Sequence, residues 1–301
     1  MQAILVPLIN LTLSIECLRV SEHLLLRKVT QSELTRWTAD DNASRLVGEA
    51  EQTRLSHVVE QHYRDLKEPL HKAEGPGEDL YTLLALLDLR MPERLRCPFM
   101  DWSDESSPTE HCIFEIPDAL PAWARSIHVT LNVDAETLSA YWAMVIRASD
   151  RGRRLRRALG RAMSARSMHF AEEVILGSTI GLECLFSPDT DRDEPANNTN
   201  IVVASACEML VDPEAFIMPE VADARFESLK SLYRVRSAIV HGKEVRGVMT
   251  EAVEHLLEVL RRCVGVALEL GVDELGTTTL FDRYTNRLTP ELAAKIATRP
   301  R

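Results

Sequence analysis

The sequence predicts an α+β N-terminal domain over residues 1–130, followed by an all-α helical bundle over residues 131–301. Three observations support this division. Before residue 130, short apolar runs of mixed period alternate with turn signals such as Gly75-Pro-Gly77, whereas beyond it apolar residues recur at helical spacing over long segments. A proline-bearing connector, residues 117–123, leads from one pattern to the other. The length of 301 residues suffices for one large or two medium domains.

The N-terminal elements follow from apolar patterning and capping signals. Thr30-Gln-Ser-Glu33 is a capping box, in which a threonine and a glutamate satisfy each other's backbone N–H groups, so a helix begins there. Residues 56–63 fit either strand or helix, and Val58-Val59 favours strand. Residues 80–89 are apolar enough to be buried in either state. We further expect extended chain at 3–13 and 16–29, a loop at 92–108 and a short strand at 111–116.

The C-terminal half is predicted to be helical from its 3.6-residue apolar period. The expected helices cover residues 135–148, 152–186, 199–210, 221–241 and 250–270. Gly160 is a candidate break in the second of them. Thr289-Pro290 opens a small terminal helix, because proline is well tolerated at the first helical position.

Composition limits the classes of function. The net charge of -11 argues against indiscriminate nucleic-acid binding, for which a basic surface is usual. The six cysteines form no CxxC pair, which is typical of a reduced, cytoplasmic protein. We find no zinc-ligand spacing, glycine-rich phosphate loop or nucleophile turn, so we expect neither a metal nor a cofactor. The apolar start fits a strand better than a signal peptide, and no run is long enough for a membrane span.

One segment is strongly basic despite the acidic total. Residues 147–166 hold eight arginines, opposed only by Asp150. On a helical wheel four of them gather opposite Leu155, Leu159 and Ala162, so the basic face points away from the core. These four are Arg153, Arg154, Arg157 and Arg161. The face is either merely solvated or a surface for the RNA backbone or an acidic partner.

A second unusual feature is a charged residue on the apolar stripe of a late helix. Arg236 shares one face with Phe226, Leu229, Tyr233 and Val240. A guanidinium there needs an anion, either a protein carboxylate or a ligand phosphate, because an unpaired buried charge costs several kcal/mol.

The end of that helix carries two more polar groups. Gly242 is placed to stop the helix, so His241 lies in its last turn, where the helix dipole favours imidazolium. Ser237 lies one turn back on the same face and could orient the imidazole. Arginine, hydroxyl and histidine together suit a phosphodiester site.

A carboxylate partner for Arg236 is available. Between residues 174 and 186 the only charge is Glu183, in a segment apolar nearly all round and therefore buried. A bidentate contact between Glu183 and Arg236 would satisfy both charges. Such a contact could equally be a structural salt bridge that holds two helices in register.

These residues also carry a family resemblance. Arg236-Ser-Ala-Ile-Val-His241 has the arginine–histidine spacing of the HEPN ribonucleases, and the run from Leu232 to Lys243 resembles the Apea-like HEPN branch. The upstream segment Gly181-Leu-Glu-Cys-Leu-Phe186 is similar to a segment that precedes the arginine–histidine helix in that branch. The resemblance covers roughly residues 135 to 270. The middle helix, residues 200–210, lacks the arginine that the family leads us to expect.

The resemblance implies a metal-independent endoribonuclease in which the 2′-hydroxyl of the RNA attacks the adjacent phosphate. Arg236 would stabilise the developing charge, His241 would transfer protons, and Ser237 would orient the imidazole or touch phosphate, with Glu183 and Tyr233 in support. It further implies a homodimer that acts on RNA, in the setting of a toxin or phage-defence effector. The alternative is a non-catalytic HEPN-like interaction or sensing module. In either case the N-terminal domain could bind a regulatory partner.

Overall fold

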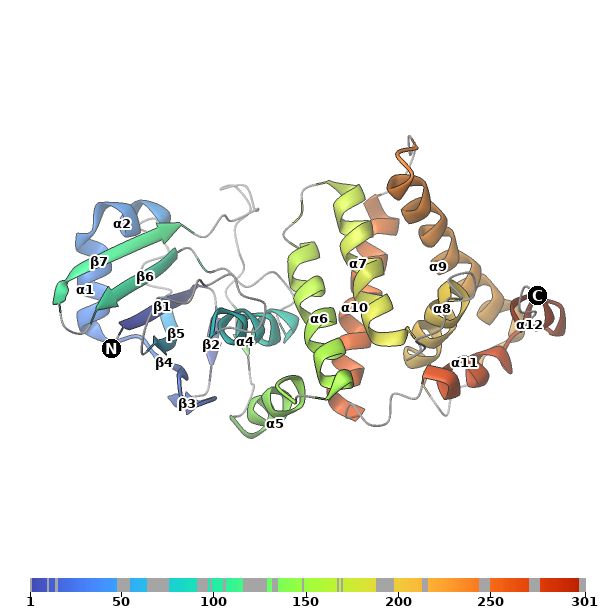
Figure 1. Ribbon diagram of the computed structural model, residues 1–301, viewed down its shortest axis with the longest axis horizontal. Coiled ribbons are helices and arrows are strands. Elements are labelled where there is room, and N and C mark those ends of the chain that lie inside the picture. The colour runs from blue at the N-terminus through green and yellow to red at the C-terminus, as the bar shows by residue number, and fades with distance from the viewer. Residues whose placement is uncertain are drawn as a thin grey trace. The chain divides into compact units, whose positions relative to one another are not determined.

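The structure is a computed structural model that divides into two compact units, Met1–Ala143 and Met144–Arg301 (Figure 1). The first unit holds an antiparallel sheet with helices, and the described elements of the second are all helices, so an α+β region followed by a helical one is confirmed. The sequence places the boundary near residue 130, and the structural division falls inside helix α5 (Ala135–Val145). The structure describes residues 2–9, 11–13, 16–47, 55–63, 76–90, 97, 99–104, 107–115, 129–131, 135–147, 149–166, 168, 170–187, 198–212, 216–243, 250–270 and 277–297.

A six-stranded antiparallel sheet forms the centre of the first unit, in the order β3-β4-β5-β1-β6-β7. β1 pairs with β5 in a register that sets Val6 opposite Val59, and both side chains are fully buried. The strands are β1 (Gln2–Ile9), β3 (Cys17–Arg19), β4 (Leu24–Lys28), β5 (Leu55–Tyr63), β6 (Phe99–Asp104) and β7 (Ser107–Glu115). A separate parallel pair joins β2 (Leu11–Leu13) to β8 (Val129–Leu131).

Helices α1 (Gln31–Ala39) and α2 (Asp41–Val47) pack their apolar side chains against this sheet. The capping box that starts α1 is confirmed, because Thr30 Oγ1 accepts from the Glu33 N–H and Glu33 accepts from the Thr30 N–H. The buried carboxylate of Asp101 accepts from Trp37 Nε1 at 2.7 Å and pairs with Arg36. This contact ties α1 to the middle of β6.

Several sequence predictions for this unit are corrected or completed. Residues 55–63 form a strand, and the apolar segment around residues 80–89 lies in helix α4 (Pro76–Arg90). The loop expected at 92–108 is wrong in its second half, where β6 and the start of β7 lie. The apolar pattern of the sequence does not indicate β6, because a residue that this strand buries is Asp101 and not an apolar one. The proline-bearing connector falls outside the described residues.

The second unit is a bundle in which α6, α7 and α10 pack together, while α8 packs with α9 and α11 (Figure 1). Its helices are α6 (Asp150–Arg166), α7 (Ala171–Phe186), α8 (Asn198–Met209), α9 (Pro219–Val240), α10 (Thr250–Leu270), α11 (Thr277–Thr285) and α12 (Pro290–Ala297). The break predicted near Gly160 is wrong: Gly160 lies inside α6, and the chain leaves the helix after Arg166. Helix α11 was not predicted.

Small residues allow α6 and α7 to approach closely. A Cβ on Gly177 would lie 3.3 Å from Ala165 Cβ, and a Cβ on Gly181 would lie 3.3 Å from Arg161 Cβ. On its other side Gly181 contacts α10, where the same Cβ would lie 2.6 Å from a methyl group of Leu260. A larger side chain at Gly181 would therefore have to displace Leu260, whereas one at Gly177 would press only on Ala165.

Candidate functional site

The candidate site is built on the C-terminal end of α9. His241 is the C-cap residue, and Gly242 follows in the left-handed conformation with φ of 65°. The Lys243 N–H donates to the Ala238 carbonyl and the Gly242 N–H to the Ile239 carbonyl, each at 2.9 Å, which is a Schellman motif. Gly242 as the helix stop is therefore confirmed. His241 and Ser237 are both exposed, so the imidazole and the hydroxyl face solvent one turn apart.

Arg236 and Glu183 are brought together, as the sequence predicts, but not in the predicted geometry. Arg236 Nη2 contacts Glu183 Oε2 at 3.3 Å, so the contact is single and not bidentate. The exposed fractions of the two side chains are 32% and 31%, so neither charge is deeply buried. Arg236 Nε, by contrast, is shielded from solvent and has no acceptor among the described residues.

The electrostatic environment of Glu183 is set mainly by partial burial. Burial raises the pKa of the Glu183 carboxyl, and the attraction of Arg236 lowers it by less, so the net shift is upward. The two helices are also joined by Tyr233, whose buried hydroxyl donates to the Thr179 carbonyl at 3.4 Å. Burial, followed by the charge of Glu183, holds the pKa of Tyr233 well above its usual value, and its hydrogen bond to Thr179 joins α9 to α7.

The basic face of α6 points outward, as predicted. Leu155, Leu159 and Ala162 are buried, whereas Arg153, Arg157 and Arg161 are exposed. Arg154 differs: it is half-buried, and its Nε donates at 3.1 Å to the Cys184 carbonyl in the last turn of α7. The helical wheel of α6 already indicates the half-burial of Arg154, because Arg154 lies at the edge of the basic face nearest the buried leucine side chains.

The α6 arginines and the Arg236–Glu183 pair lie on either side of α7. Burial raises the pKa of the Cys184 thiol, and the charges of Arg157 and Arg161 oppose this shift, so both arginines lie near the C-terminal part of α7. Glu183 is the neighbouring residue and contacts α9. Charged side chains of α6 and α9 therefore both lie near the C-terminal part of α7, and no sequence pattern indicates that Cys184 lies between them.

Compared with protein-family models, curated proteins and solved structures, the chain shows no match. Within the part of the chain that the structure describes, no three His, Cys, Asp or Glu side chains come together as a set of metal ligands. The helices in that part include none that is both long and apolar enough to cross a membrane.

Proposed function

We propose that this protein is an endoribonuclease of the HEPN type that cuts RNA without a metal ion and acts as a toxin or phage-defence effector. The observation that carries the proposal is that Arg236, Ser237 and His241 lie at the C-terminal end of α9, where Arg236 contacts Glu183 on α7 and arginines of α6 lie near the same end of α7. RNA cleavage by the 2′-hydroxyl needs a group that transfers protons and a cation next to the phosphate, while the RNA itself supplies the nucleophile.

Each residue has a role that its surroundings allow. Arg236, held at 3.3 Å from Glu183 and still one-third exposed, would stabilise the charge that develops on the phosphate. His241 would transfer protons, because it lies at an exposed helix end where RNA can reach both ring nitrogens. Ser237 would orient the imidazole or touch phosphate. Arg153, Arg157 and Arg161 would bind the RNA backbone, with Arg154 holding the end of α7 beside them.

One subunit places the two principal groups poorly for a single phosphate. Arg236 and His241 are five residues apart, which is about 140° around an ideal helix. A two-fold homodimer would resolve this by combining Arg236 of one subunit with His241 of the other.

The cleavage experiment uses the full-length protein and RNA in EDTA-containing buffer. Wild-type protein should yield products with 2′,3′-cyclic phosphate ends, and His241→Ala and Arg236→Ala should each abolish cleavage. The matched controls are His255→Ala on α10 and Arg234→Ala on α9, since both side chains are exposed and lie outside the proposed site. Cleavage that survives His241→Ala, or a folded protein that cuts no RNA under any condition tried, would contradict the proposal.

The dimer is tested by mixing the two inactive variants. If each site takes Arg236 from one subunit and His241 from the other, random reassortment restores one complete site in half of the dimers, which is about a quarter of wild-type activity. If both residues act within one subunit, no mixed dimer holds a complete site and the mixture stays inactive.

A non-catalytic interaction or sensing module is the second candidate. It is favoured by two observations: Arg236 already contacts the Glu183 carboxylate, and helix α8 carries no arginine to assist it. In this case RNA binding would persist without cleavage, and the N-terminal domain would hold the regulatory partner.

A further inference from the structure

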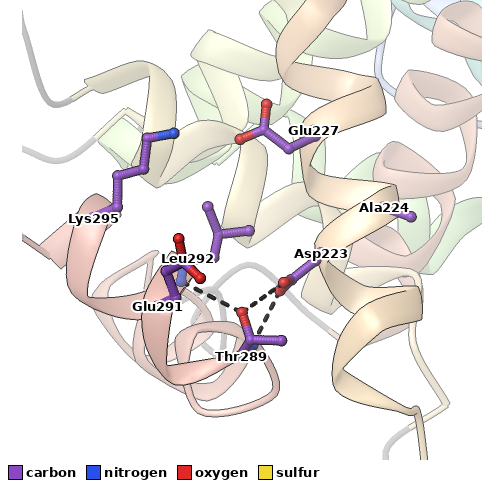
Figure 2. A pocket seen from close by; sticks show the side chains of 7 residues that line it. All are labelled: Asp223, Ala224, Glu227, Thr289, Glu291, Leu292 and Lys295. Atoms are coloured by element: carbon purple, nitrogen blue, oxygen red, sulfur yellow. Dashed lines mark hydrogen bonds between the residues drawn. The ribbon is translucent and has the colours of Figure 1, made fainter.

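A second surface of the helical unit is unrelated to the proposed ribonuclease site. Between α9 and α12 lies an open cleft of about 370 Å³, shown in Figure 2. Asp223, Ala224 and Glu227 line it from α9, and Glu291, Leu292 and Lys295 from α12. Leu292 is buried, so the cleft has an apolar floor beneath charged walls.

The two walls are fastened together by a specific contact. Asp223 Oδ1 accepts from the Thr289 N–H at 3.1 Å, and Asp223 Oδ2 accepts from the Thr289 hydroxyl at 2.6 Å. Thr289 in turn caps α12, because its Oγ1 accepts from the Leu292 N–H at 3.4 Å. Just before it in the chain, the Tyr284 hydroxyl donates to the Ala222 carbonyl at 2.9 Å. The cleft is therefore built into the fold before any ligand arrives.

The charge of the lining favours a cationic occupant. Three carboxylates, those of Asp223, Glu227 and Glu291, face one ammonium group, that of Lys295. Asp223 accepts one hydrogen bond from Thr289 at each oxygen, and its carboxylate adds negative charge to the cleft. Glu227 contacts Arg234 through one oxygen at 3.3 Å and remains 38% exposed. A lysine or arginine side chain could be received between Glu227 and Glu291.

An exposed apolar stripe lies at the start of the same helix. Phe216, Met218 and Val221 are 88%, 58% and 45% exposed, at and just before the start of α9. Val221 is three residues before Ala224, which lines the cleft, and six before Glu227, so it projects about 120° around α9 from Glu227 and a bound segment would cross the exposed face of the helix. From Met218 to Glu227 the surface extends about 13 Å along the helix, at about 1.5 Å per residue. Exposed apolar side chains next to a charged cleft indicate a docking surface and not a small-molecule pocket.

We propose that the cleft and the stripe together bind a basic, amphipathic segment of a partner protein. A lysine or arginine of that segment enters the cleft between Glu227 and Glu291, and its apolar side chains cover Met218 and Val221. The occupant is a polypeptide because one polypeptide chain can carry a basic side chain for the cleft and apolar side chains for the stripe, several residues apart. RNA is disfavoured, since the carboxylates would repel its phosphates.

The test is a selection of random displayed peptides on immobilised full-length protein. Enriched peptides should carry lysine or arginine a few residues from apolar side chains. Labelled copies should bind about fivefold to tenfold more weakly, by fluorescence anisotropy, to the double variant Glu227→Gln, Glu291→Gln, and more weakly to Val221→Ser. The matched control, Glu251→Gln with Glu254→Gln on the exposed face of α10, should bind as wild type. Circular dichroism checks that each variant is folded.

Two outcomes would overturn the proposal. One is that no peptide is enriched, or that the enriched peptides show no excess of lysine or arginine. The other is a set of enriched peptides that bind the cleft variants as tightly as wild type. Asp223 is left unchanged throughout because its loss would release α12.

Discussion

The contact between Arg236 and Glu183 should stabilise the fold only weakly. The one close contact, between Arg236 Nη2 and Glu183 Oε2 at 3.3 Å, joins two side chains that are about one-third exposed. Exposed ion pairs contribute about 0.2 to 1 kcal/mol, whereas breaking a buried pair costs about 3 to 5 kcal/mol. A double-mutant cycle of Glu183→Gln and Arg236→Gln, followed by urea unfolding at pH 7, should therefore give a coupling free energy below about 1 kcal/mol.

The pH dependence of this pair follows from the direction of the Glu183 shift. Partial burial raises the pKa of Glu183 above its ordinary value of 4.5, and Arg236 only partly opposes this. The folded protein therefore holds this proton more tightly than the unfolded chain. The resulting stabilisation is complete below pH 4.5 and is lost as the pH rises through the folded-state pKa.

Two consequences can be measured in the same unfolding experiments. Glu183→Gln should be no less stable than wild type at pH 7, because a neutral amide avoids the desolvation of the carboxylate. Arg236→Gln should lose stability at pH 7 and recover it on acidification, as Glu183 takes up a proton. The exposed pair Glu227 and Arg234 is the matched control. A coupling above about 3 kcal/mol, or a strongly destabilised Glu183→Gln, would refute the reasoning and indicate a buried structural bridge.

Other substitutions test packing, the N-terminal network and the basic face. Gly160→Ala should raise the free energy of unfolding by about 0.5 to 1 kcal/mol, because nothing lies within 4 Å of the new methyl group. Gly181→Ala should instead lower it by about 1 to 3 kcal/mol, since its Cβ would lie 2.6 Å from Leu260 Cδ2, and equal effects in urea unfolding would contradict this account. Arg27→Ala should cost about 3 kcal/mol because it removes the arginine that pairs with two largely buried carboxylates, whereas Arg234→Ala should cost less than about 0.5 kcal/mol by the same method. Replacing the exposed α6 arginines with glutamine should weaken RNA binding and flatten its salt dependence in filter-binding titrations, and an unchanged slope would assign that face to solvation. Those arginines are Arg153, Arg157 and Arg161.

Features set by local chemistry could be predicted from the sequence. The capping box at Thr30 and the helix stop at Gly242 depend on residues a few positions apart, and both were found where the sequence placed them. The outward basic face of α6 follows equally from helical periodicity. Helix α2 has a similar local signal, because Asp40 precedes it and its Oδ1 accepts from the N–H groups of Asn42 and Ala43.

Features set by tertiary contacts could not be predicted in this way. Strand β6 is held by its pairing with β1 and by the buried Asp101, neither of which alternation reveals. Helix α11 has several threonines, and its position depends on the fully buried Tyr284. The sequence indicated that Glu183 and Arg236 would meet, but their single contact and partial exposure depend on how α7 and α9 cross.

The close approach of α6 and α7 at Gly181 has a consequence for any RNA that lies across them. Arg157 and Arg161 project from α6, so their distance from Arg236 is set by the spacing of the helices as well as by their own flexible side chains. A bulkier residue at position 181 would shift both arginines together relative to α9. If RNA lies across these helices, a substitution at Gly181 would then move the arginines away from the phosphates that they contact, although Gly181 would itself touch no nucleotide.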